Sequence, residues 1–126
     1  MRKDNSTNAE NNAFLKSICP MQTAMNQLSG KWKILLLWYI HLGLNRFGLI
    51  RQRLPTLTTK MLSQQLREME QDGLITRTIY PEMPPRVEYA ITEKTRALIP
   101  IFEQLNAWGK TEKPDNSCYR VKNVEQ

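Results

Sequence analysis

The sequence has few of the residues that build catalytic and metal sites. Its 126 residues include one histidine, His41, and two cysteines, Cys19 and Cys118. Two cysteines are too few for a disulfide framework or a zinc site, and His41 lies in the most apolar stretch, where we expect a core or boundary side chain rather than a general base. Serine-elbow, phosphate-loop and paired-carboxylate motifs are missing as well. We therefore expect that the protein is not an enzyme and that it binds no metal ion or cofactor.

Long apolar segments are also lacking. The longest run, "ILLLWYIHLG" at 34–43, is bounded by Lys33 and is shorter than the roughly 20 residues that span a bilayer. The polar stretch 1–18 has none of the apolar character of a signal peptide. These features predict a cytoplasmic protein that has a buried helix at 34–43 and no membrane partner.

What the chain does have is positive charge. Lysine and arginine total 18 against 12 acidic residues, which gives a net charge of +6 and an isoelectric point near 9.6. Such a balance favours polyanions, although basic runs are often only solubility devices. Between residues 45 and 67 the chain carries no acid and these five basic residues: Arg46, Arg51, Arg53, Lys60 and Arg67.

Hydrophobic periodicity and capping residues predict one domain at 19–110 between polar tails at 1–18 and 111–126. Pro20 begins the first helix, Thr58 or Thr59 caps the fourth, and Gly73 ends it. A final helix runs from Thr92 to about 109, with a kink at Pro100. The expected elements are helices at 20–29, 31–42, 48–54 and 58–72, a hairpin at 75–91, and the final helix.

The hairpin is unusual because of its connection. "LITRTIY" (74–80) and "RVEYAI" (86–91) alternate apolar and polar residues, but the loop between them contains Pro81, Pro84 and Pro85. Since proline fixes φ and cannot donate to a strand ladder, this loop should extend stiffly beyond the paired strands. A rigid hairpin after three helices and a short helix predicts a mainly α fold, the winged helix-turn-helix.

The helix at 58–72 has the two faces that a DNA-recognition helix needs. Leu62, Leu66 and Met69 form an apolar side, whereas Lys60, Ser63, Gln64 and Arg67 share another side, which we call the recognition stripe. Lysine pairs with guanine and glutamine with adenine in the major groove. The acids Glu68, Glu70 and Asp72 are expected at the far end of the helix, clear of a duplex.

We therefore interpret the chain as a protein that binds double-stranded DNA. The wing would lay Arg86 and Arg77 against the sugar-phosphate backbone or the minor groove. Polar helix stripes are often merely solvated faces, and a winged-helix module for protein interaction, without DNA binding, is the main alternative. The candidate DNA contacts are Arg46, Thr58, Thr59, Lys60, Ser63, Gln64, Arg67, Arg77 and Arg86.

The last helix carries an apolar stripe that is too large for one small domain to cover. Burial against a second copy would make a two-fold dimer, and packing on its own domain is the alternative. The stripe consists of Leu98, Ile101, Phe102, Leu105 and Trp108.

The segments "CPMQTAMNQLSGKWKILLLWYI", "TTKMLSQQLREMEQDGLITRTIYPEMPPRVEYAIT" and "LNAWG" together resemble the HxlR-type regulators. These are small bacterial winged-helix transcription factors related to the MarR group, and the resemblance covers about 19–110. It implies a homodimer built from the first and last helices, so that Met21 and Met25 join the interface. It also implies that the protein binds a palindromic operator, usually as a repressor and sometimes as an activator. The sequence identifies no small-molecule effector.

Cys19 is the expected cap of the helix that Pro20 begins. The positive end of a helix dipole favours a thiolate and raises its reactivity. The resemblance implies that a cysteine at this position serves some members as a sensor of oxidants or electrophiles, and Cys118 is a speculative partner for a disulfide. The alternative is that Cys19 is only a small apolar packing residue.

Overall fold

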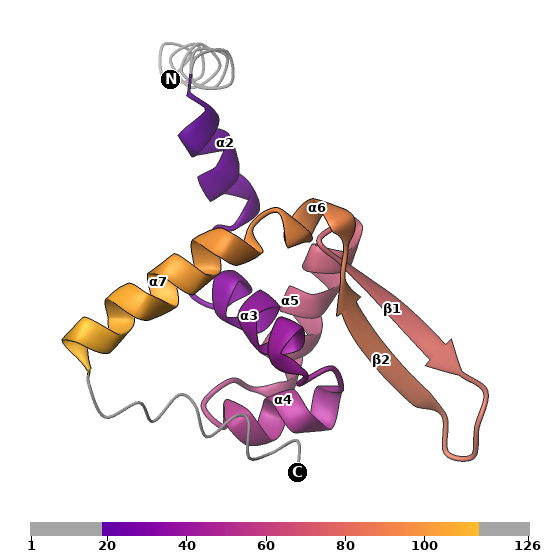
Figure 1. Ribbon diagram of the computed structural model, residues 1–126. Helices are drawn as coiled ribbons and strands as arrows, with labels where there is room; N and C mark the ends of the chain where they lie inside the picture. Colours follow the sequence, from indigo (N-terminus) through magenta and orange to yellow (C-terminus); the bar gives the residue numbers. More distant parts are fainter. Residues whose placement is uncertain (1–18, 114–126) are drawn as a thin grey trace, which may run out of the picture. The chain divides into compact units, whose positions relative to one another are not determined.

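The computed structural model describes residues 19–113 (Figure 1). The expectations that concern 1–18, Cys118 and the rest of 114–126 lie outside the described residues. The chain forms two compact units, Met1–Gly30 and Lys31–Gln126. The first unit contributes helix α2 (Pro20–Gln27), and every other described element belongs to the second unit.

Helix α2 begins as its sequence predicts. Pro20 occupies the first turn, where its missing N–H has no intrahelical partner to lose, and Cys19 is the residue before it. The carbonyl of Cys19 accepts hydrogen bonds from the backbone N–H groups of Gln22 and Thr23, at 3.0 and 3.2 Å. Met21 and Met25, one turn apart, are both exposed. Helix α2 therefore carries an exposed apolar face.

Three helices form the body of the second unit: α3 (Lys33–Leu42), α4 (Phe47–Arg53) and α5 (Thr59–Gln71). Helix α3 ends at Gly43, whose φ of 117° is a left-handed conformation that side chains disfavour. The guanidinium of Arg51 donates to the carbonyl of Leu57 and so ties α4 to the turn before α5. The helices share a buried core that includes Leu36, Leu37, Leu44, Ile50, Leu57, Leu62, Leu66 and Met69. The predicted apolar side of α5 is thus confirmed.

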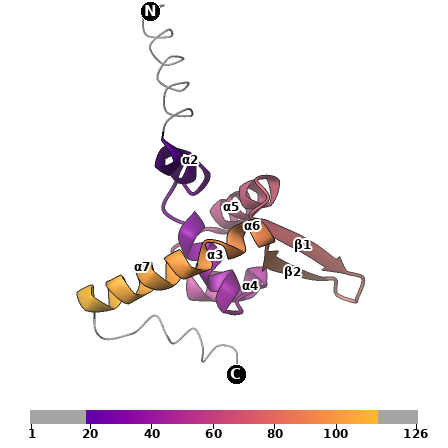
Figure 2. The ribbon, with the colours of Figure 1, turned by 45° about the horizontal axis from the view of Figure 1, so that its top comes forward.

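Strands β1 (Ile75–Tyr80) and β2 (Arg86–Ile91) form an antiparallel hairpin, paired from Ile75 opposite Ile91 to Tyr80 opposite Arg86. The strands and the proline-containing loop 81–85 are called the wing below. Figures 1 and 2 show the wing extending away from α3, α4 and α5. The backbone N–H of Tyr89 donates to the carbonyl of Asn45 at 2.9 Å, so the segment between α3 and α4 supports β2. The fold is a winged helix-turn-helix, as predicted.

Two threonines join the base of the wing to the next helix, α6 (Glu93–Arg96). The hydroxyl of Thr95 is fully buried and donates to the carbonyl of Leu74 at 2.6 Å. Thr92 caps α6 and donates to the carbonyl of Gly73 at 2.7 Å. These bonds hold the start of β1 and the end of β2 at one place, from which the wing projects.

The predicted single helix from Thr92 is wrong. The structure has two helices, α6 and α7 (Ile99–Glu112), and Pro100 lies in the first turn of α7 instead of kinking a continuous helix. The physical reason is that proline lacks an N–H and clashes with the preceding turn, so it is tolerated at a helix start and disrupts a helix interior. Helix α7 packs on α3.

Candidate nucleic-acid interface

The recognition stripe lies along one exposed side of α5. Lys60, Gln64 and Arg67 are exposed and Ser63 is half-buried. Thr58 caps the helix, because its hydroxyl oxygen accepts the N–H of Met61 at 3.1 Å. The first turn contains no acid, so the positive end of the helix dipole is not neutralised there. The start of α5, including exposed Thr58 and Thr59, therefore offers hydrogen-bond donors and positive potential to an anion.

One contact beside the recognition stripe was not predicted from the sequence. Lys33 is only 7% exposed, and its ammonium lies 2.9 Å from a carboxylate oxygen of Glu68. The other oxygen of Glu68 accepts a hydrogen bond from the side-chain amide of Gln64 at 3.2 Å. Hydrogen bonding by Lys33, followed by that of Gln64, holds the pKa of Glu68 below its ordinary value of 4.5. The spacing of Gln64 and Glu68, four residues apart on a helix, was the available signal.

The expected acidic cluster at the end of α5 is therefore divided. Glu68 turns towards α3 and Gln64, whereas Glu70 lies 3.6 Å from the guanidinium of Arg77 on β1. Glu68 and Glu70 pair with basic residues on different elements, because residues two apart on a helix point in different directions.

The arginines of the wing are engaged within the protein. Arg86 donates to Glu82 at 2.9 Å and to Glu88, and its guanidinium lies 4.0 Å from the centre of the Tyr80 ring. Arg46, just before α4, lies 3.5 Å from the same Glu88. Hydrogen bonds between Arg86 and these acids raise the pKa of the guanidinium, and the bond to Arg86 lowers the pKa of Glu82. The wing thus compensates much of its own charge.

The basic segment 45–67 also divides into two kinds of residue. Arg51 holds the turn before α5, and the guanidinium of Arg53 lies 5.9 Å from the centre of the Tyr39 ring, so both contribute to the fold. Lys60 and Arg67 form no salt bridge with another described residue. The positive charge of this segment that remains available lies on α5.

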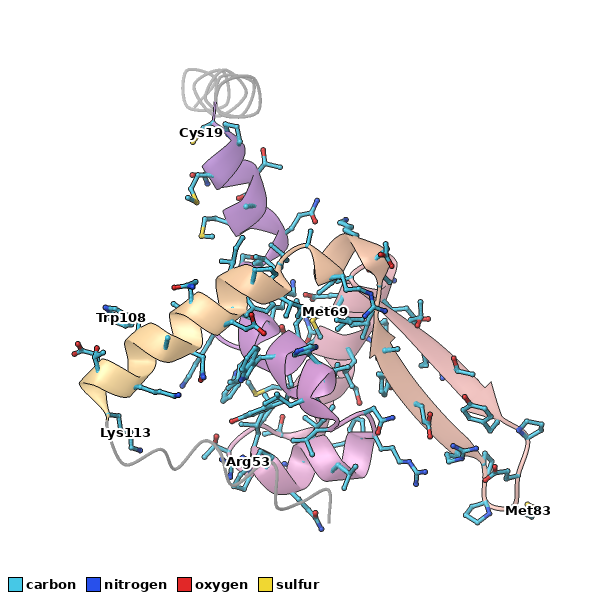
Figure 3. All side chains as sticks on the ribbon, in the orientation of Figure 1. Cys19, Arg53, Met69, Met83, Trp108 and Lys113 are labelled. Carbon is cyan, nitrogen blue, oxygen red and sulfur yellow. The ribbon has the colours of Figure 1, made fainter. Side chains whose placement is uncertain are left out.

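The predicted apolar stripe on α7 is only partly available. Phe102 is 4% exposed, because it packs into the core of its own chain, and Leu98 is half-buried. Ile101, Leu105 and Trp108 are exposed, and Figure 3 shows the Trp108 ring projecting from α7. These last three residues fall on one side of the helix at intervals of four and three positions. They are called the α7 apolar face below.

Other candidate positions are simpler. His41 is exposed and its ring lies 5.7 Å from that of Trp38, which makes it a boundary side chain. Cys19 is half-buried at the start of α2. Within residues 19–113, no three His, Cys, Asp or Glu side chains are grouped to hold a metal ion. No helix in the same range is long and apolar enough to cross a membrane.

Known proteins are similar to this chain in sequence and in fold. Residues 27–117 match the family described as HxlR-like helix-turn-helix. An uncharacterized HTH-type transcriptional regulator of Methanothermobacter thermautotrophicus is 48% identical over 93 residues, which are 74% of this chain and 71% of the relative. The uncharacterized HTH-type transcriptional regulator YybR of Bacillus subtilis is 39% identical over 105 residues, covering 83% of this chain and 84% of the relative.

Two solved structures show the same fold. The redox regulator HypR in its oxidized form is 41% identical, with a TM-score of 0.70 over 74% of this chain and 96% of that chain. The diamide-treated YodB from B. subtilis is 35% identical, with a TM-score of 0.61 over 75% of this chain and 94% of that chain. The family is one of transcriptional regulators and not of enzymes, and its helix-turn-helix implies DNA binding. With a capped recognition helix beside a hairpin wing, and a family match over most of its length, the chain belongs to the HxlR-like helix-turn-helix transcriptional regulators.

Proposed function

We propose that the protein is a sequence-specific repressor that binds a palindromic operator as a homodimer. The observation that carries this proposal is the recognition stripe, which presents exposed Lys60, Gln64 and Arg67 along one side of a helix that is packed on the core by its other side. A module that only bound other proteins would have little need for this pattern of donors and cations beside an uncompensated helix start.

The geometry supports distinct roles for the proposed contacts. Lys60, Ser63 and Gln64 would read base edges in the major groove. Contacts to the sugar-phosphate backbone would come from Arg46, Thr58, Thr59, Arg67, Arg77 and Arg86. The arginines among these that pair with carboxylates, Arg46, Arg77 and Arg86, would exchange a carboxylate for a phosphate on binding, so their net contribution should be smaller.

Selection of duplexes from a randomised pool by the purified protein tests this proposal. We expect an enriched palindrome, a steep fall of affinity with salt, and protection of that sequence in a footprint. Gln64→Ala should relax the base preference at one position of each half-site, at a cost of about 1–3 kcal/mol. Absence of any enriched sequence, with affinity independent of salt, would favour the alternative of a module for protein interaction.

The dimer is proposed from the exposed apolar surfaces. Trp108, the largest member of the α7 apolar face, is 63% exposed, and Met21 and Met25 are exposed on α2. Contiguous apolar groups at a helix surface favour association, because burying them removes apolar area from water. A two-fold dimer would place its recognition helices about 34–36 Å apart, one turn of DNA.

Leu105→Glu should convert the dimer to a monomer, because it places a charge in the middle of the α7 apolar face. Multi-angle light scattering at micromolar concentration measures the mass. Ala107→Glu is the matched control, since Ala107 is exposed on another side of the same helix and receives the same charge. A wild-type monomer, or equal masses for the two variants, would contradict the proposed interface.

We also propose that Cys19 senses oxidants or electrophiles. Two structural relatives are described as a redox regulator and as a diamide-treated regulator. In this chain Cys19 is half-buried at the start of α2, a helix proposed for the dimer interface, so its modification would change operator affinity through the dimer. In this proposal Cys118 is the disulfide partner of Cys19.

A gel-shift titration of the wild type and Cys19→Ser, with and without diamide or a quinone, tests this role. We expect oxidant to change the affinity of the wild type and to leave Cys19→Ser unchanged. Cys118→Ser shows whether the second cysteine takes part. Equal operator affinity of wild type and Cys19→Ser under every condition would make Cys19 a structural residue.

A further inference from the structure

We infer that Glu68, held by Lys33, determines the base preference of α5 by fixing the side-chain amide of Gln64. The inference rests on the proposed function, in which α5 reads base edges. It adds two positioning residues, neither of which needs to touch DNA. The three groups form a chain that runs from the buried side of α3 to the exposed side of α5: Lys33, Glu68, Gln64.

The end of this chain of groups at α3 is buried. Lys33 begins α3, and its side chain is 9% exposed against 39% for Glu68. A lysine ammonium in such a site needs a partner, and Glu68 is its partner at 2.9 Å. One carboxylate oxygen is thereby held towards α3, and the other faces Gln64. The ion pair therefore sets the position of the acceptor that Gln64 meets.

At the exposed end, the side-chain amide of Gln64 can take two orientations. A glutamine amide has two N–H donors and one carbonyl acceptor, and pairing with adenine needs one donor for N7 and the acceptor for the 6-amino group. A carboxylate accepts only, so the bond to Glu68 engages one N–H and leaves the second N–H and the oxygen available. A donor and an acceptor thus remain on Gln64, which is the combination that the edge of adenine requires.

Charge supports the same arrangement. Hydrogen bonds from Lys33 and Gln64 keep the pKa of Glu68 below its ordinary value, so this group is a carboxylate at neutral pH and does not donate. Lys33 also compensates a negative charge that would otherwise stand one turn from the proposed base contact. A preorganised contact loses less side-chain entropy on binding than a free glutamine does.

A purely structural role is the competing explanation, because the ion pair also ties α3 to α5. The two roles differ in what they change. Loss of a structural tie lowers stability and weakens binding to all duplexes alike. Loss of a positioning contact lowers the ratio of affinities for A·T and G·C at the single base pair that Gln64 contacts.

The experiment uses the full-length protein and the duplex that it selects from a randomised pool, together with duplexes changed at one base pair. The base pair is identified as the one where Gln64→Ala removes the preference. Glu68→Gln is the main variant, because it keeps the size of the side chain and presents a donor as well as an acceptor. Lys33→Met removes only the ammonium. Asp72→Asn is the matched control, an exposed acid near the end of the same helix.

We expect Glu68→Gln and Lys33→Met to lower the preference at that base pair by about three- to tenfold and to leave the other positions unchanged. Asp72→Asn should behave as the wild type. In the Gln64→Ala background Glu68→Gln should have no further effect on the ratio, since both act through one contact. Thermal unfolding shows whether Lys33→Met still folds. If it does not fold, the base preference of Glu68→Gln alone tests the inference.

Several outcomes overturn the inference, and they separate it from the proposed function. The inference is overturned, and the proposed function is not, if Glu68→Gln changes the base preference by less than about twofold. The same holds if the base preference of the double variant differs from that of Gln64→Ala. A preference unchanged by Gln64→Ala also overturns it, while DNA binding stands. If the wild type selects no sequence, the proposed function fails and the inference fails with it.

Discussion

Helix α5 and the wing both carry basic side chains, but they hold them differently. Lys60 and Arg67 on α5 are exposed and form no salt bridge with another described residue, and the first turn of that helix has no acid. On the wing, Arg86 is bonded to Glu82 and Glu88 and stacked on Tyr80. A count of basic residues would rate the two regions alike, since each has two. Their surroundings differ: the basic side chains of α5 are exposed and form no salt bridge with another described residue, whereas those of the wing are paired with carboxylates of the same chain.

The difference has a physical reason in each region. A helix packed on the core needs no ionic contact to keep its exposed side in place, so that side is left available for binding. A two-stranded hairpin is marginally stable alone, and the wing buries few side chains along its length. The cross-strand contact of Arg86 with Tyr80 stabilises such a ribbon, and the bond of Arg86 to Glu88 on the same strand adds to it.

The largest expected effect comes from removing the two exposed cations of α5, which form no salt bridge with another described residue. Lys60→Ala combined with Arg67→Ala should lower the affinity for the selected duplex strongly and reduce the slope of log affinity against log salt by about one to two. The matched pair on the wing, Arg77→Ala with Arg86→Ala, should weaken all sequences alike and reduce the slope by less. Fluorescence anisotropy at several salt concentrations measures both. An equal or greater loss from the wing variant would break the comparison.

A smaller effect of the opposite sign should follow when the wing arginines are released. Glu88→Gln removes the carboxylate that Arg86 and Arg46 share, so their charge becomes available to phosphates and binding should tighten by about two- to fivefold at low salt. Glu103→Gln, an exposed acid on α7, is the control for net charge. If both variants bind alike, the wing arginines do not compete between carboxylate and phosphate.

The smallest effect concerns acid stability, where the two regions should behave alike. The pKa values of Glu68 and Glu82 are lowered by their basic partners, so the stabilisation they contribute is present above the ordinary value of 4.5 and is lost as the pH falls through the lower folded-state value. The melting temperature of the wild type should exceed that of Glu68→Gln at neutral pH and converge with it in acid. Glu82→Gln should show the same trend. A difference that grows in acid would reverse the sign of this argument.

The elements of the fold were predictable because they depend on neighbours in the sequence. Pro20 at a helix start, Thr58 as a cap, Gly73 with φ of 76° after α5, and alternation along the two strands all act over a few residues. Proline at position 100 was identified as a disruption, yet whether it kinks a helix or begins a new one depends on packing around it. The structure places it at the start of α7.

The sequence by itself determined the winged helix-turn-helix and the polar stripe of α5, since helical and strand periodicities decide which side chains share a face. Only the tertiary structure decided which charged side chains of the described residues pair with one another. Lys33 meets Glu68 across 35 positions of sequence, Arg46 meets Glu88 across 42, and Phe102 is buried in the core although its neighbour Ile101 is exposed. Such pairs depend on how helices and strands pack, and no local pattern records which distant side chain a lysine or arginine will reach.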